Sequence, residues 1–254
     1  MTPPVTYRIG KVPVHAVTLE EARDRILQSV RGGQKAYVCI SNMRTVVQAD
    51  RDPAYLEVMN HSLMNLPDGM PLVWCGKAWG IKRVDRVVGL DLFTTLLQTD
   101  EPQFFLGDTE KTLSALTAKA AVQGTPVAGH YSPPFAPLEE YDLKSIAERV
   151  NGSGATLVWT SLRAPKQDFL ASRLLPYLND GIVLIGVGAA FRLYLGEYVL
   201  DRGLLEKMGL GGLKMLRNTT VWKELKWYVS HTFHLLRFLA VIIWKRLNGK
   251  NAEG

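Results

Sequence analysis

Leu66-Pro67-Asp68-Gly69-Met70-Pro71 holds one carboxylate between a proline, whose φ is fixed, and a glycine, which can adopt a positive φ. We therefore predict that Asp68 lies on a sharp, stiff turn. Pro71 suits the first turn of a helix, so the turn should lead directly into a helix that runs to about Trp79. Two interpretations follow. Asp68 caps that helix, or it acts as a general base at a place where strands of a sheet end.

On both sides of this turn, short apolar runs alternate with stretches of helical periodicity, as in β-α-β units. The predicted strands are residues 12–17, 36–40, 63–66, 103–107, 126–129, 155–159 and 182–185. The predicted helices are residues 18–30, 43–49, 53–61, 71–79, 87–97, 109–121 and 138–150. This order predicts an α/β, Rossmann-like fold over residues 1–197, with a mostly parallel sheet and helices on both faces. Residues 198–254 are predicted to form a helical appendage.

Local signals support particular elements of this scheme. Pro13 cannot donate to a strand ladder, so residues 12–17 are placed at an edge. Thr18 and Glu21 have the spacing of a capping box at the start of the first helix. Residues 130–137 are rich in proline and predict a stiff loop instead of regular structure.

Composition and charge narrow the class of protein. The chain has 254 residues, 47% of them hydrophobic, which suffices for one large core. Lysine and arginine balance aspartate and glutamate over residues 1–213, at 22 each, whereas residues 214–254 carry 8 against 2. A neutral body argues against nucleic acid as a partner, and a basic end argues for an anionic one. Cys39 and Cys75 lie in apolar runs and are expected to be reduced core thiols, which favours a cytoplasmic protein.

Polar residues and glycines gather where the predicted strands end, which is where open α/β sheets bind ligands. Asn42 follows one strand and either caps the next helix or contacts a ligand. Arg163, Lys166 and Gln167 follow the predicted strand 155–159. They are expected either to bind a phosphate or a uracil ring, or to belong to a solvated loop. Gly186-Val187-Gly188 permits close approach of a nucleotide, but it closes the alternating region and lacks a third glycine, which argues against nicotinamide binding.

The sequence contains no P-loop, zinc-ligand spacing or nucleophile elbow, so we expect neither a catalytic metal nor a cofactor. The residues predicted to bind substrate, including two in the appendage, are Ser41, Asn42, Gly69, Gly107, Arg163, Lys166, Gln167, Gly188, Lys214 and Arg217.

Taken in order, five of these segments resemble the successive motifs of the WecG/TagA/CpsF glycosyltransferases, over about residues 12–196. The segments are Asn42, Leu66-Pro67-Asp68-Gly69, Phe105-Leu106-Gly107, Pro165-Lys166-Gln167-Asp168 and Gly186-Val187-Gly188. The resemblance implies an inverting, metal-independent enzyme of surface polysaccharide synthesis, which moves a hexose from a UDP-sugar to a polyprenyl-diphosphate-linked sugar. It also implies that Asp68 is the catalytic base, that Asn42 lines the same pocket and that Gln167 contacts the donor nucleotide.

The chain departs from the family pattern at several positions. Where the family usually has Thr, Gly and Asp, this sequence has Ile40, Ala164 and Arg192. The family's appendage carries arginines thought to reach the donor diphosphate. Here Met215 stands roughly where the first of them would fall, and Lys214 and Arg217 are the nearest substitutes.

Residues 222–247 have basic side chains along one helical face and apolar ones opposite, with tryptophans suited to a lipid headgroup boundary. We expect this segment to lie on an anionic membrane surface, or alternatively to pack on the body or on another subunit of a homo-oligomer. The first interpretation predicts a peripheral protein on the cytoplasmic face of the bacterial inner (plasma) membrane. A non-catalytic nucleotide-binding scaffold at that surface is the alternative function, and a nucleotide-sugar dehydrogenase or epimerase would require nicotinamide.

Overall fold

A computed structural model describes residues 4–198 of the chain. The predicted appendage, including Lys214 and Arg217, therefore lies almost entirely outside the described residues, and its boundary with the body stays a prediction. Among residues 4–198, no helix is both long enough and apolar enough to cross a membrane.

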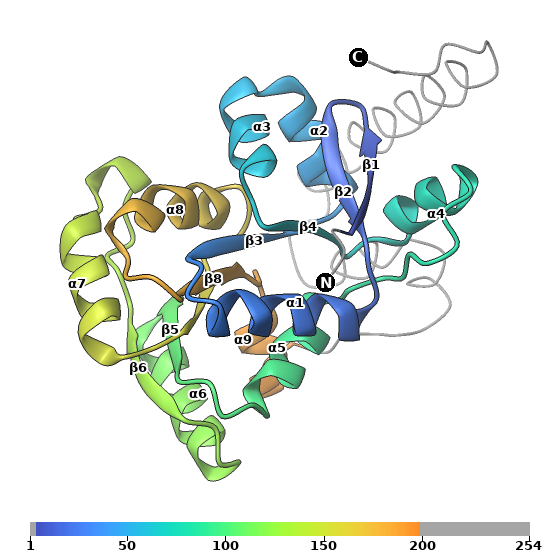
Figure 1. Cartoon of the computed structure of the whole chain (residues 1–254). Coiled ribbons are helices and arrows are strands. Elements are labelled where there is room, and N and C mark those ends of the chain that lie inside the picture. Colours follow the sequence, from blue (N-terminus) through green and yellow to red (C-terminus); the bar gives the residue numbers. More distant parts are fainter. Residues whose placement is uncertain (1–3, 199–254) are drawn as a thin grey trace.

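Six parallel strands form the central sheet in the order β4-β3-β8-β7-β5-β6 (Figure 1). The strands are β3 (Ala36–Ser41), β4 (Met64–Pro67), β5 (Gln103–Gly107), β6 (Val127–Tyr131), β7 (Leu157–Ser161) and β8 (Val183–Gly186). The predicted α/β fold with a mostly parallel sheet is thus confirmed. Because all six strands are parallel, their carboxyl ends and the loops that follow lie along one edge, here called the carboxyl edge.

The strand predicted at residues 12–17 forms instead half of a separate antiparallel hairpin, β1 (Val5–Ile9) with β2 (Val12–Ala16). Gly10, with φ of +62°, allows the tight turn between them. Asn65 on β4 attaches this hairpin to the sheet, because its side-chain amide donates to the carbonyl of Pro13 at 3.0 Å. The edge position expected for Pro13 is consistent with this two-stranded arrangement.

Helices cover both faces of the sheet, as predicted (Figure 1). One face is covered by α2 (Met43–Arg51), α3 (Pro53–Asn60), α7 (Leu143–Ser153) and α8 (Lys166–Leu174). The other face is covered by α1 (Leu19–Arg31), α5 (Gly89–Leu97), α6 (Glu110–Val122) and α9 (Ala190–Leu195). The remaining helix, α4 (Met70–Ala78), packs against the hairpin, and η1 (Leu138–Glu140) and η2 (Leu175–Tyr177) are short 3₁₀ turns.

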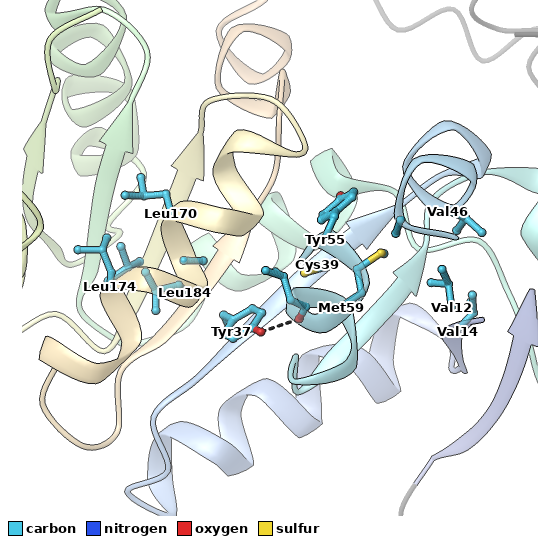
Figure 2. Close-up of a cluster of buried hydrophobic side chains, with 14 of the residues drawn as sticks. Val12, Val14, Tyr37, Cys39, Val46, Tyr55, Met59, Leu170, Leu174 and Leu184 are labelled. Carbon is cyan, nitrogen blue, oxygen red and sulfur yellow. Dashed lines mark hydrogen bonds between the residues drawn. The ribbon is translucent and has the colours of Figure 1, made fainter. Parts of the chain in front are cut away.

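The core has two layers because each sheet face is apolar. Figure 2 shows part of the layer beneath α2, α3 and α8, in which Tyr37 and Cys39 of β3 lie near Tyr55 of α3. The hydroxyl of Tyr37 donates to the carbonyl of Val58 at 2.5 Å, which satisfies its polar end inside the core. Cys39 and Cys75 are buried free thiols, as expected.

The capping signal at Thr18 was reliable, whereas the bounds predicted for some other elements were not. The capping box is confirmed, since Thr18 accepts from the Glu21 amide at 3.2 Å and Glu21 accepts from the Thr18 amide at 3.0 Å. The single helix predicted at 138–150 is wrong, because Asp142 accepts from the Ser145 amide and starts a new helix there. β6 also continues to Tyr131, two residues into the predicted proline-rich loop.

Candidate active site

Asp68 lies at the carboxyl edge, directly after β4 and two residues before α4 begins. Its amide donates to the carbonyl of Ser41 at 2.8 Å, which fixes the turn against the end of the neighbouring strand. Gly69, not Asp68, is the N-cap of α4, and no side chain caps that helix. The capping interpretation of Asp68 is therefore wrong. Gly69 has φ of −100°, so this turn does not use the positive φ that glycine permits.

Arg86 lies beside this carboxylate, a contact that the sequence analysis missed. Its Nε donates to the backbone carbonyl of Asp68 at 2.5 Å, and its Nη2 lies 3.6 Å from Asp68 Oδ1. Both side chains are partly open to solvent, at 31% for Asp68 and 25% for Arg86. The loop that carries Arg86 is held near β4, because the amide of Val87 donates to the carbonyl of Pro67 at 2.9 Å. The arrangement pairs a reachable carboxylate with a guanidinium.

Ser41 and Asn42, at the end of β3, lie next to the Asp68 turn. Asn42 Oδ1 accepts from the amides of Arg44 and Thr45 at 3.0 and 3.2 Å, so Asn42 caps α2. A Cβ added to Gly69 would lie 3.7 Å from the Asn42 Cβ, which places the two residues in contact range. Ser41 is buried, and its carbonyl receives the Asp68 amide. The helix-capping interpretation of Asn42 is confirmed, and a ligand contact stays a prediction.

Gln167 and Gly188 are brought together, but by a contact within the protein. The Gly188 amide donates to Gln167 Oε1 at 3.0 Å, and the Ser161 hydroxyl donates to the Gly188 carbonyl at 2.6 Å. Gln167 is only 2% exposed, so it supports the loop after β8 from behind. Gly188 has φ of +56° and open space around its missing Cβ. A ligand can thus approach the Gly188 backbone more easily than the Gln167 side chain.

Lys166 and Arg163 point to different surroundings. Lys166 Nζ donates to the Ala136 carbonyl at 2.5 Å and to the Tyr141 hydroxyl at 3.0 Å, so it ties α8 to the loop after β6. Arg163 is exposed and adopts φ of +60°, which is uncommon for a residue with a side chain. Of the three residues predicted to bind a phosphate or a uracil ring, Arg163 alone is exposed.

The loops after β3 and β7 are also joined directly. Arg44, at the start of α2, donates from Nη2 to the carbonyl of Ala164 at 3.3 Å. Hydrogen bonds therefore connect the Asp68 turn, through the end of β3 and the start of α2, to the Pro165-Lys166-Gln167 segment. The structure places these predicted motifs at one edge of the sheet, as the sequence interpretation requires.

Gly107 and Asp108 end β5 further along the edge. Gly107 has φ of +99°, and a Cβ there would meet Leu162 at 3.0 Å, so the close approach of these loops requires glycine. The Asp108 carboxylate receives Nη2 and Nε of Arg192 at 2.7 and 2.9 Å. Burial acts to raise the pKa of Asp108, but the hydrogen bonds from Arg192 and from the Thr109 amide outweigh it and lower that pKa. This ion pair was not expected from the sequence.

Asp168 is a buried carboxyl directly behind Gln167. The Tyr55 hydroxyl donates to Asp168 Oδ2 at 2.5 Å. Burial raises the pKa of Asp168 to about 7, although hydrogen bonds from Tyr55, Cys39 and Gln167 and the charge of Arg44 act in the opposite direction. Two of these hydrogen-bond partners, Cys39 of β3 and Tyr55 of α3, are labelled in Figure 2. The carboxyl therefore changes charge near neutral pH.

Two further findings concern metal ligands and cavities within residues 4–198. No group of three His, Cys, Asp or Glu side chains is arranged to hold a metal ion there. A cavity of about 360 Å³ lies between α1 and the start of β4, lined in part by Arg25, Gln28 and Met64. None of the predicted site residues lines that cavity, because they follow the opposite ends of the strands.

The missed residues carried weak signals. Arg86 lies in a loop between two helices, and nothing in its neighbours indicates that the loop returns to the end of β4. Asp108 follows Gly107 at a strand end, so its position at the carboxyl edge could have been found from the sequence. Its pairing with Arg192, 84 residues away, could not.

The chain is similar to known glycosyl transferases. A family model described as "Glycosyl transferase WecG/TagA/CpsF family" matches residues 7–252. A protein of Bacillus spizizenii named N-acetylglucosaminyldiphosphoundecaprenol N-acetyl-beta-D-mannosaminyltransferase is 25% identical over 197 residues, which span 75% of this chain and 74% of that protein. Because the family model matches almost the whole chain, this protein belongs to the WecG/TagA/CpsF family of glycosyl transferases.

Proposed function

We propose that the chain transfers a hexose from a UDP-sugar to a polyprenyl-diphosphate-linked sugar, with inversion and without a metal, in synthesis of a cell-surface or exopolysaccharide. The observation that carries this proposal is the Asp68 carboxylate, partly exposed at the carboxyl edge and paired with Arg86. Family membership supports glycosyl transfer, and the name of the Bacillus relative supports a diphosphoundecaprenol-linked sugar as the class of acceptor.

In this proposal, a single displacement accounts for the chemistry. The acceptor hydroxyl oxygen forms a bond to the anomeric carbon of the donor while its proton passes to Asp68. The bond from that carbon to the UDP oxygen breaks, and its electron pair leaves with UDP. One positioned general base typically contributes 10²–10⁴-fold to the rate. Negative charge grows on the departing diphosphate, and cations at the same edge, such as Arg86 and the exposed Arg163, are placed to stabilise it.

Attack from the face opposite the leaving group inverts the anomeric centre, and it needs only one carboxylate. Retention through a covalent intermediate would need a nucleophile and a separate acid and base. Metal independence is proposed because residues 4–198 contain no cluster of metal-ligating side chains. The D-x-D pair Asp50-Arg51-Asp52, at the end of α2, is engaged by the protein, since the two carboxylates accept from the backbone amides of Lys11 and Ala54. The proposed location is the cytoplasmic face of the bacterial inner membrane, where a lipid-linked acceptor and a nucleotide sugar can meet.

The test is a panel of UDP-sugars incubated with short-chain polyprenyl-diphosphate-sugar acceptors, scored by product mass with and without a chelator. One donor should give a product that is larger by one hexose or hexosamine unit. Asp68→Asn should lower turnover by about 10²-fold or more, because the amide cannot accept the proton. Asp85→Asn, an exposed aspartate in the loop that carries Arg86, is the matched control. Wild-type turnover by a folded Asp68→Asn protein would exclude the proposed base.

A further inference from the structure

The end of α4 presents an aromatic and basic surface to solvent. Trp74 is 45% exposed although it is one of the largest apolar side chains of the chain. Lys77 is exposed one turn further along the same helix, Lys82 and Arg83 are exposed in the segment that follows it, and Ile81 is partly exposed. We name these five residues, Trp74, Lys77, Ile81, Lys82 and Arg83, the α4 tip. Figure 1 shows α4 at the periphery of the molecule, on the side of the β1–β2 hairpin.

The α4 tip is an ordered surface and not a frayed helix end. After α4, the amide of Gly80 donates to the Lys77 carbonyl at 2.9 Å, and the amide of Ile81 donates to the Gly76 carbonyl at 3.1 Å. These bonds satisfy the last carbonyls of the helix. Trp79 turns inward, with its ring 6.0 Å from that of Tyr7. The backbone of the tip is therefore fixed while Trp74 points away from the core.

The three charged residues of the α4 tip, Lys77, Lys82 and Arg83, are all basic. Two carboxylates offset part of this charge: Glu21 pairs with Arg83 at 2.5 Å, and Asp85 is exposed two residues after Arg83. Arg83 stays 77% exposed despite this pair. Tryptophan favours the boundary between lipid headgroups and hydrocarbon, and basic residues near an anionic leaflet each strengthen binding. We propose that the α4 tip docks on the surface of an anionic lipid bilayer.

This inference rests on the proposed function for its biological meaning, because a lipid-linked acceptor must reach Asp68 from a membrane. α4 starts directly after the Asp68-Gly69 turn, and its nine residues span about 13 Å. Docking through the tip holds the carboxylate one short helix away from the headgroup layer. The contact is made by the α/β body and is separate from the one predicted for residues 214–254.

Vesicle co-sedimentation of the full-length protein tests the docking without any sugar substrate. The probes are vesicles of phosphatidylcholine with about a third phosphatidylglycerol, and vesicles of phosphatidylcholine alone. Lys77→Glu with Lys82→Glu should lower the partition coefficient on anionic vesicles by roughly tenfold or more, since each basic side chain contributes. Trp74→Glu should lower it on both kinds of vesicle, and Trp74→Phe should retain most of the binding.

Matched changes elsewhere on the body control for charge and for loss of an aromatic side chain. Lys111→Glu with Lys144→Glu makes the same charge change at exposed positions of α6 and α7. Tyr177→Glu replaces another aromatic residue that is 45% exposed. These variants should bind vesicles within about twofold of wild type, allowing for the screened long-range effect of charge. Equal losses in the control and tip variants, or unchanged binding by both tip variants, would overturn the proposal.

Measurements of sugar transfer distinguish a failure of lipid docking from a failure of the proposed function. With a water-soluble short-chain acceptor, the Lys77→Glu, Lys82→Glu protein should turn over like wild type, since neither lysine belongs to the candidate active site. With a long-chain acceptor in anionic vesicles, its rate should fall with its binding. If no variant and no wild-type protein transfers sugar, the proposed function fails, yet the vesicle measurements still decide whether the tip binds lipid.

Discussion

Arg86 contacts Asp68 at two points, through Nε to the backbone carbonyl and through Nη2 to the carboxylate, at 2.5 and 3.6 Å. The first contact fixes the turn and the second sets the electrostatic environment of the proposed base. A guanidinium can make both contacts because its donors form a rigid fork. The geometry of the carboxylate therefore depends on a residue 18 positions away in the chain.

Arg86→Lys should lower turnover by roughly tenfold or more, because one ammonium group cannot span the carbonyl and the carboxylate together. The variant should remain folded, since Arg86 is partly open to solvent. Steady-state rates with the soluble acceptor measure the effect. Arg83→Lys is the control, because Arg83 is exposed and pairs with Glu21 instead. Equal rates for the two variants would argue that the Arg86 fork has no role in positioning Asp68.

Gln167→Ala should destabilise the protein by about 1–3 kcal/mol, because it leaves the Gly188 amide without its buried acceptor. It should also raise the KM for the donor more than it lowers kcat, since the loop after β8 loses its support. Urea unfolding and initial rates measure the two effects. The comparison variant is Gln98→Ala, at an exposed helix end. A raised KM with unchanged stability would favour direct contact between Gln167 and the donor.

The sequence predicted the main sheet well because its strands are buried on both faces and read as short apolar runs. It missed β1, since only Tyr7 and Ile9 of that strand are buried and residues 4–8 show no continuous apolar run. It also predicted which loops meet, because the carboxyl ends of parallel strands share one edge. Knowing that two loops meet does not indicate which side chain bonds to which.

For that reason the candidate site was only partly predictable. Gln167 and Lys166 have side chains suited to a nucleotide, yet both are engaged by the protein, by the Gly188 amide and by the loop near Tyr141. Arg86 and Asp108 act through partners distant in sequence, and no local pattern encodes such pairs. Asp68 was predictable because proline, glycine and a helix start constrain its position locally.

The pair of Asp108 and Arg192 predicts a coupled substitution. Arg192→Asp, which restores the residue type of the resembling family, should destabilise the protein by about 2 kcal/mol or more, because it removes the partner of a buried carboxylate and adds a like charge. Asp108→Gly in the same protein should recover most of that loss, since glycine tolerates the φ of +63° at this position. A double-mutant cycle by urea unfolding measures the coupling. Additive effects would contradict a direct interaction.

His15 predicts a loss of stability in acid. It is largely buried, and its Nδ1 accepts from the Asn65 amide at 3.0 Å. Burial lowers the pKa of His15 to about 4 from an ordinary 6.5. The unfolded state therefore binds more protons between these values, and stability falls as the pH drops from about 6.5 to 4. His15→Asn, which keeps an acceptor near the same place, should lessen this fall by up to about 3 kcal/mol.

Burial of Asp168 predicts the opposite dependence of stability on pH, over an overlapping pH range. Its native pKa is raised to about 7 from 3.8, so the native state keeps a proton that the unfolded state releases. Stability from this group is full below about pH 4 and is lost as the pH rises through 7. In the wild-type protein this partly cancels the effect of His15. A stability that hardly changes with pH would therefore not show that neither group has a shifted pKa.

Asp168→Asn separates the two contributions. The amide can still accept from Tyr55 but cannot titrate, so the variant should gain stability relative to wild type as the pH rises from 4 to 8. Urea unfolding at one-unit pH steps, with Asp142→Asn at an exposed helix start as the control, measures that difference. The pH profile of kcat/KM adds a second readout, because ionisation of Asp168 beside Gln167 should weaken the support of the Gly188 loop above pH 7. Parallel stability profiles for the variant and wild type would mean that Asp168 has the same protonation state in the folded and unfolded chain at each pH. In that case its burial behind the site would have no consequence for pH dependence.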